Sequence, residues 1–196
     1  PDLLAAYNVV FIFDLSCVAG SDDITEYAVV TSSGNEFAVL TTPILLDVRG
    51  LIAGKGGFGA DVDGTAAAGG PAISLDDNVR LSNTGVIGGG GGGGNFQTST
   101  DVTDADAAGG GGAGFENSVG GTGSGPSTFS EAEGGSNQSG GDGAFATSSS
   151  TQATGGRGGN LGAAGQYSGG AAGAAIALNG YTITYINTGT ILGTVS

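Results

Sequence analysis

The chain has 196 residues, of which 44 are Gly, whereas Gly usually makes up about 7 % of a protein. It carries 18 acidic and 4 basic side chains, so its formal net charge is −14 and it would repel a nucleic-acid backbone. There is no His and a single Cys, which removes the commonest general base and metal ligand and any internal disulfide. We therefore expect a non-enzymatic protein with no cofactor, no metal site and no nucleic-acid partner.

The first 53 residues form an apolar region that predicts β-structure. Residues 8–13 and 27–31 are continuous runs of β-forming side chains, a pattern typical of strands buried on both faces. No apolar run reaches the length of about 20 residues that a membrane-spanning helix needs. We interpret residues 1–53 as an N-terminal β region that serves for attachment or as a scaffold.

A sequence repeat occurs three times, in residues 36–52, 71–87 and 174–195. Each copy reads as a strand, a turn, a second strand and then the motif G-x-I-x-G. One Ile holds the same place in every copy: Ile52, Ile87 and Ile191. The turn of the last copy is Asn179-Gly180, a pair typical of β-hairpins. The repeat therefore predicts related β-hairpin units packed near one another, with residues 174–196 as a closing hairpin and the three Ile side chains buried.

Residues 54–173 consist mostly of Gly, Ala, Ser and Asn, apart from the second repeat copy at 71–87. Gly recurs there at every third position, as at Gly156, Gly159, Gly162 and Gly165. Three is the repeat of the polyproline II helix, which lacks internal hydrogen bonds and needs parallel neighbours to satisfy its backbone groups. We expect packed polyglycine II helices in four stretches: 54–70, 88–95, 108–114 and 155–173.

The alternative for this region is a flexible or disordered Gly/Ser linker. Two features favour order: the glycine tracts are short and joined by aromatic-bearing loops, and a β-unit follows them to close the domain. The expected fold class is therefore all-β, with repeated β-hairpin units that scaffold a polyglycine II helix bundle.

Two segments resemble a known protein family. The segment 81–94, LSNTGVIGGGGGGG, and the segment 169–193, GGAAGAAIALNGYTITYINTGTILG, are similar to the glycine-rich C-terminal receptor-binding domain of phage tail-tip proteins. That group includes the central tip proteins related to the host-specificity protein of lambda-like phages, and the motif style is similar to the tip adhesins of T-even phages. The resemblance covers roughly residues 45–196. It implies a β-scaffold with packed polyglycine II helices, whose variable loops touch the host receptor.

On this resemblance we interpret the chain as an adhesin domain at the tail tip of a virion, acting at the extracellular surface of the host. Its implied partners are a host-surface receptor, either an outer-membrane protein or a glycan, and other tail-tip proteins; a homotrimer is one alternative for its assembly. The alternative functions are a cellular extracellular or surface-layer structural protein and an antifreeze-type glycine-rich protein. The irregular loops between the Gly tracts disfavour an ice binder, which needs a flat face of repeated Thr or Ala.

Five aromatic residues stand alone in polar or small-residue segments between the Gly tracts: Phe96, Phe115, Phe129, Phe145 and Tyr167. A single aromatic on a short loop offers a large contact area at little loss of rotamer entropy. The alternative for each of them is an inward plug over a thin core. Together with Asp101 and Asp104, which follow Phe96 in sequence, they form the candidate receptor-binding set.

The acidic loops raise the question of a cation site. Oxygen ligands suited to Ca²⁺ are carried by Asp101, Asp104 and Asp106, and by Asp61 and Asp63. Residues 56–61 match the start of a Ca²⁺-binding nonapeptide. Because Asp63 occupies the apolar position of that motif and no tandem copy follows, we interpret these segments as solvated acidic loops. No G-x-S-x-G motif occurs, and no His could activate a nucleophile, so no catalytic residue is predicted.

Overall fold

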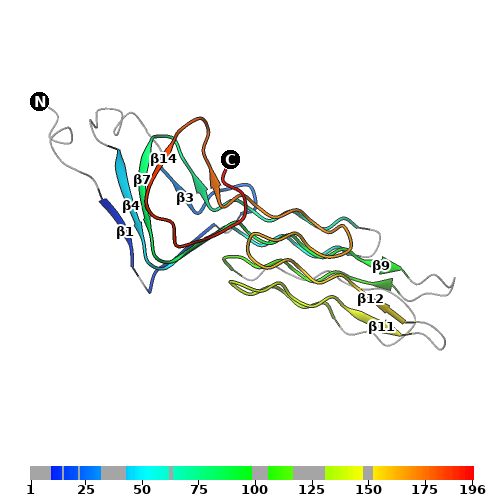
Figure 1. The fold of residues 1–196 in the computed structure, drawn as a ribbon. Helices are drawn as coiled ribbons and strands as arrows, with labels where there is room; N and C mark the ends of the chain where they lie inside the picture. Colours follow the sequence, from blue (N-terminus) through cyan, green and yellow to red (C-terminus); the bar gives the residue numbers. More distant parts are fainter. Residues whose placement is uncertain are drawn as a thin grey trace, which may run out of the picture.

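The computed structural model describes residues 10–14, 16–21, 23–31, 43–61, 64–98, 106–116, 131–147 and 152–196. Within these ranges there is no α-helix, and the regular elements are short β-strands. No helix in the described ranges is long and apolar enough to cross a membrane. A β-stranded part and a glycine-rich bundle that extends from it make up the molecule (Figure 1).

Three sheets form the β-stranded part. The first contains, in spatial order, β1 (Val10–Phe13), β4 (Ile44–Val48), β7 (Val79–Asn83) and β14 (Ile183–Asn187). The second contains β2 (Val18–Gly20), β5 (Leu51–Ala53), β8 (Val86–Gly88) and β15 (Thr190–Leu192). The third contains β3 (Val29–Val30), β6 (Ile73–Ser74) and β13 (Ile176–Ala177). Every neighbouring pair in these sheets is parallel.

Because successive strands belong to different sheets, the chain winds as a parallel β-solenoid in which each coil adds one strand to every sheet. The coils are β1-β2-β3, β4-β5-β6, β7-β8-β13 and finally β14-β15, after which Val195 bridges Ile176 of the third sheet. Each coil buries its apolar rows against the coil before it. This stacking explains why the same short motif returns along the chain.

The predicted equivalence of the three Ile residues is confirmed. Ile52 lies opposite Ile87, and Ile87 lies opposite Ile191, all in the second sheet. Ile52 and Ile87 are fully buried. Ile191 is half-buried, because β15 is the last strand of its sheet.

The predicted β-hairpins at 71–87 and 174–195 are wrong, and the first strand of the unit 36–52 lies outside the described residues. The strands on either side of the two described turns pair with the equivalent strands of neighbouring coils, as β13 does with β6 and β14 with β7. Asn179 and Gly180 do have the positive φ angles of a tight turn, 50° and 87°. The strands that flank this turn do not pair with each other, because β13 stacks on β6 of the second coil and β14 stacks on β7 of the third. The expected closing hairpin at 174–196 is therefore the end of the third coil followed by the fourth.

The sequence repeat missed the first coil, and it overestimated the burial of the N-terminal strands. Ala19 lies opposite Ile52 in that coil, where a small residue replaces the Ile of the motif. Val10 and Ile12 of β1 are exposed, because β1 is the edge strand of its sheet among the described residues. Residues 8–13 and 27–31 are therefore not buried on both faces in their described portions.

The solenoid interior is an aliphatic core to which all three sheets contribute. Its fully buried members include Ile44, Val48, Leu81, Ile87 and Ile176. One polar side chain, Asn83, is also completely buried, and all of its bonds link neighbouring coils or its own turn. Its Nδ2 donates to the carbonyl oxygens of Thr188 and Thr190, at 2.9 and 3.1 Å, and its Oδ1 accepts from the N–H of Gly85 at 3.0 Å. Asn83 therefore ties the third coil to the fourth without leaving a buried polar group unsatisfied.

The glycine-rich bundle is formed by two long connections of the solenoid. Residues 54–72 join β5 to β6, and residues 89–175 join β8 to β13, so both connections leave between the second and third sheets. Figure 1 shows the resulting tracts running side by side away from the solenoid. The bundle is thus an elaboration of two turns of the solenoid.

A central tract, residues 88–95, is surrounded on all sides. It exchanges backbone hydrogen bonds with six neighbouring tracts: 54–60, 67–70, 110–113, 156–162, 163–166 and 170–173. The direction of donation repeats every third residue, since Gly90 and Gly93 donate to one neighbour and Gly91 and Gly94 to another. A residue with no Cβ is required on every side of such a tract, which explains the run of seven Gly at 88–94.

Candidate functional site

The end of the bundle farthest from the solenoid carries two short antiparallel strand pairs (Figure 1). One pair is β9 (Gln97–Thr98) with β10 (Asp106–Ala107), and the other is β11 (Phe145–Thr147) with β12 (Gln152–Thr154). A cluster of buried alanines lies at their base: Ala107, Ala108, Ala144, Ala146 and Ala153. Small side chains allow close approach of the strands, so the two strand pairs have a packed base.

Two aromatic side chains of the candidate set are exposed at or near this end. Phe145 on β11 is 42 % exposed and Tyr167 is 52 % exposed, whereas Phe96, next to β9, is half-buried. Tyr167 lies in a turn in which its own φ is 55° and that of Ser168 is 56°. The Asn95 Nδ2 donates to the Tyr167 carbonyl oxygen at 3.2 Å, which fastens this turn to the central tract.

The other candidate residues do not join this group. Phe115 lies at the junction with the solenoid, where it is half-buried against Ala53, Ala113 and Leu161. A Cβ added to Gly20 of β2 would overlap its ring, so Phe115 fills the space next to that Gly. Phe129, Asp101 and Asp104 lie outside the described residues. We therefore restrict the described part of the candidate surface to Phe96, Phe145 and Tyr167.

Among the described residues of the bundle, the exposed aromatic Phe58 was not included in the candidate set. Phe58 is 45 % exposed on the tract 54–60, along the bundle and away from the strand pairs at its end. It obeys the same rule as the chosen aromatics, a single aromatic among Gly and Ala, and that rule would have found it. Its position on the side of the bundle makes it a useful comparison for Phe145.

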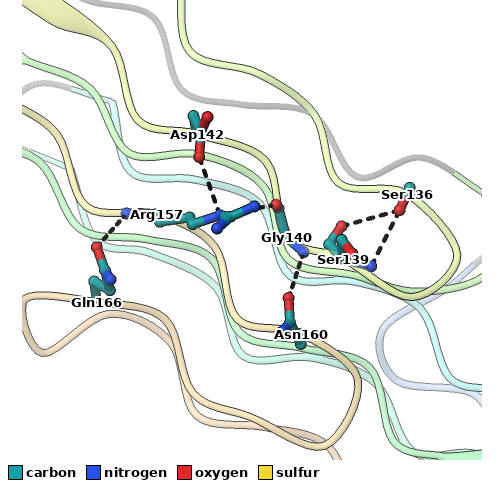
Figure 2. A network of polar contacts seen from close by, with 7 residues as sticks. All are labelled: Ser136, Ser139, Gly140, Asp142, Arg157, Asn160 and Gln166. Atoms are coloured by element: carbon teal, nitrogen blue, oxygen red, sulfur yellow. Dashed lines mark hydrogen bonds and ion pairs between the residues drawn. The ribbon is translucent and has the colours of Figure 1, made fainter.

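A polar network covers one side of the bundle (Figure 2). Arg157 Nε lies 3.0 Å from Asp142 Oδ1, and the Arg157 N–H donates to Gln166 Oε1 at 3.2 Å. Next to them, the Gly140 N–H donates to Asn160 Oδ1 at 3.2 Å. The network joins three neighbouring tracts, while the side chains of Arg157 and Asp142 are 52 and 68 % exposed.

Replacing Arg157 by Gln is expected to lower the free energy of unfolding by no more than about 1 kcal/mol, because an exposed ion pair is screened by water and salt. Urea denaturation measures this loss, and Asp142→Asn serves as the partner variant for a double-mutant cycle. The difference is expected to shrink in high salt. A salt-independent loss above about 2 kcal/mol would show that the network holds the bundle together more strongly than a surface ion pair does.

Within the described ranges, no group of three or more acidic or Cys side chains could hold a metal ion. All four cationic side chains of the protein lie in these ranges, and three of them have acidic partners: Arg49 with Asp47, Lys55 with Glu116, and Arg157 with Asp142. The remaining negative charge is spread over the chain and is not gathered into a described cation site.

Comparisons with known proteins identify the family. The model of the phage tail fibre adhesin Gp38 matches residues 2–196. A solved structure, the gp37-gp38 adhesin tip complex of the bacteriophage S16 long tail fiber, contains a chain with the same fold: 25 % identity, a TM-score of 0.70, and coverage of 98 % of this chain and 74 % of that chain. No curated protein matches the sequence.

These matches confirm the phage tail-tip part of the expected resemblance; its lambda-like branch is not confirmed. They do not support the surface-layer and antifreeze alternatives, and the matched family is an adhesin family, not an enzyme family. The chain thus belongs to the Gp38 family of phage tail fibre adhesins, virion proteins at the tail tip that act at the host-cell surface.

Proposed function

We propose that this adhesin binds its host receptor through the end of the bundle farthest from the solenoid. The contact surface contains Phe96, Phe145 and Tyr167, together with the segments 99–105 and 148–151, which follow β9 and β11 in sequence. Asp101 and Asp104 belong to the first of these segments. The observation that carries the proposal is the exposure of Phe145, which lies between the buried Ala144 and Ala146, and of Tyr167, in the turn that Asn95 fastens to the central tract. Aromatics held on a packed base lose little conformational entropy on binding.

We propose that the receptor is an outer-membrane protein or a glycan. Aromatic side chains flanked by Ser, Thr, Asn and Gln suit surfaces that combine hydroxyl groups with small apolar faces. The net charge of −14 opposes approach to an anionic envelope unless salt or divalent cations screen it. Adsorption should therefore depend on ionic conditions as well as on the aromatic contacts.

We further propose that the tracts of the bundle are polyglycine II helices. The three-residue period in the direction of hydrogen bonding and the six neighbours of the central tract support this. Backbone groups that point in three directions need neighbours on every side, and the central tract has them. The role of such a scaffold is to hold the receptor loops at a distance from the solenoid.

The matched adhesin from phage S16 was solved in a complex of two different proteins, gp37 and gp38. We propose that this chain likewise joins a tail-fibre protein, which we favour over a homotrimer because that complex is formed by unlike chains. On this proposal, the residues that attach the adhesin to the tail-fibre protein are 1–53, 71–87 and 174–196. The rest of residues 54–173 binds the receptor.

Replacing Phe145 by Ala is expected to weaken adsorption of the purified adhesin to host cells by roughly thirtyfold, because a desolvated aromatic anchor contributes about 2 kcal/mol to binding. Tyr167→Ala should act in the same direction. The measurement is a binding isotherm of labelled adhesin on whole host cells, with thermal unfolding recorded for each variant.

The matched control is Phe58→Ala, since Phe58 is as exposed as Phe145 but lies along the side of the bundle. It should adsorb like the wild type. If Phe145→Ala and Tyr167→Ala both fold and adsorb normally, the receptor surface lies elsewhere. A loss with Phe58→Ala alone would move the contact surface to the side of the bundle.

A further inference from the structure

Two neighbouring tracts of the bundle present a side chain to solvent at every third residue. Their exposed residues are Ser139, Asp142 and Phe145 in one tract, and Thr154, Arg157 and Asn160 in the other. The residues between them are Gly or Ala, and all but Gly143 are buried. The tracts are antiparallel neighbours, because Phe145 lies opposite Thr154 and the Gly158 N–H donates to the Gly141 oxygen at 2.9 Å. The two rows therefore form one band of side chains along the side of the bundle.

Part of this band is fastened to the backbone of the bundle (Figure 2). We call Asp142, Arg157, Asn160 and Gln166 the lateral strip. The Asn160 Oδ1 accepts from the Gly140 N–H, and the Gln166 Oε1 accepts from the Arg157 N–H, both at 3.2 Å. Because a backbone N–H can only donate, both amide groups turn their oxygen toward the bundle. Their amide nitrogens make no bond to the described residues and remain available as donors.

The guanidinium of Arg157 is held in a similar way. Its Nε lies 3.0 Å from the Asp142 Oδ1 and donates to the Gly140 carbonyl oxygen at 3.4 Å. Its two terminal nitrogens make no bond to the described residues. A side chain that is already held loses less conformational entropy when it binds a ligand. The lateral strip thus offers three fixed groups of N–H donors, with the exposed carboxylate of Asp142 as an acceptor beside them.

The arrangement of donors and acceptors suits the hydroxyl groups of a sugar. A hydroxyl group both donates and accepts, so adjacent hydroxyls can accept from Arg157 and donate to Asp142. Arg157 and Asp142 cancel each other's charge, and the protein as a whole carries −14, which together favour a neutral ligand over an anionic one. A protein partner would need an apolar centre to bury, and the four residues of the lateral strip are all polar. Exposed groups at regular intervals fit an extended chain of repeating units.

We propose that the lateral strip binds a neutral polysaccharide chain of the host envelope. This inference goes beyond the receptor contact proposed for the end of the bundle, since it assigns a second binding surface with its own ligand. Two contacts on one rigid bundle act together: a glycan held along the side raises the effective concentration of the bundle end near its receptor. The lateral strip therefore serves the first, weaker contact with the cell surface.

The test uses the whole chain and polysaccharide released from host envelopes by mild acid, separated by anion exchange into a neutral and an acidic fraction. Asn160→Asp and Gln166→Glu replace the free amide nitrogen by oxygen and keep the oxygen that accepts from Gly140 or Arg157. Each is expected to weaken binding of the neutral fraction about fivefold, the effect of one lost hydrogen bond. Arg80→Gln is the matched control, because it makes the same change in net charge at an exposed position of the solenoid. Thermal unfolding of all three variants should stay close to that of the wild type.

Arg80→Gln and Phe145→Ala are expected to bind the neutral fraction like the wild type. Undiminished binding by both Asn160→Asp and Gln166→Glu would overturn the proposal, as would an equal loss with Arg80→Gln or binding of the acidic fraction alone. A loss with Phe145→Ala and not with the strip variants would assign the glycan to the end of the bundle and also overturn it. Failure of the wild type to bind either fraction, with Phe145-dependent adsorption to cells intact, would reject the lateral strip and leave the proposed receptor contact standing. Strip-dependent binding of the neutral fraction, with adsorption independent of Phe145, would support the lateral strip and reject that receptor contact.

Discussion

Gly91→Ala is expected to lower the free energy of unfolding by about 3 kcal/mol or more, because several inter-tract hydrogen bonds of about 0.5–1.5 kcal/mol each would be lost. Gly91 is buried in the central tract, and a Cβ there would overlap the carbonyl oxygen of Gly159. Moving that neighbour away would disturb the bond from the Gly159 N–H to the Gly92 oxygen, which is 2.8 Å long. One methyl group therefore forces apart two tracts whose backbones are in direct contact.

Urea denaturation and amide hydrogen exchange would measure this effect. Ala164→Val is the control, since it adds two methyl groups at an exposed position of the same bundle and should be nearly neutral. In the wild type, slow amide exchange is expected across residues 88–95, whose N–H groups are almost all bonded to other tracts. Fast exchange throughout that tract, with a neutral Gly91→Ala, would mean a flexible linker and refute the packed bundle.

Ile87→Asp is expected to prevent folding. Ile87 is fully buried between Ile52 and Ile191 in the second sheet, so the new carboxylate would have only apolar neighbours on either side. A buried charge without a partner falls in the exceptional class of substitutions that destabilise by more than about 4 kcal/mol. Loss of soluble protein, or loss of the cooperative thermal transition, would report this outcome.

The loss of stability caused by the same Ile→Asp substitution is expected to depend on how deeply the Ile is buried in the solenoid. Ile191→Asp is expected to be destabilising but less so, because Ile191 is half-buried in the last coil. Thr190→Asp, at an exposed position of the same strand, should fold normally. Equal stability of Ile87→Asp and the wild type would show that the register of the second sheet is wrong.

Local sequence signals predicted the positions of many elements but not their pairing partners. The motif around Ile52, Ile87 and Ile191 placed three residues in one register, because the same burial requirement recurs in each coil. Asn179-Gly180 correctly predicted a tight turn with positive φ. The inference from that turn to a hairpin was wrong, because a turn sets the chain direction locally while burial of apolar rows selects the neighbouring strand.

The candidate site was predictable to a similar extent. Phe145 and Tyr167 were found because an aromatic in a small-residue segment is conspicuous in the sequence, and both are exposed. Phe115 has the same sequence signature, yet it fills the space beside Gly20 at the solenoid junction. The difference lies in residues distant in sequence, which no local pattern around Phe115 contains.

By itself, the sequence determined that this protein is a glycine-rich, acidic, all-β chain with a repeated buried Ile and no catalytic His, since composition and short-range periodicity depend only on the order of residues. Only the tertiary structure decided that the repeats stack as parallel coils, that the tract 88–95 is enclosed by six others, and that the sheet β1-β4-β7-β14 lies opposite the candidate receptor end. These features arise from contacts between distant segments, where burial of apolar rows and satisfaction of every backbone N–H select one arrangement among those that the local signals permit.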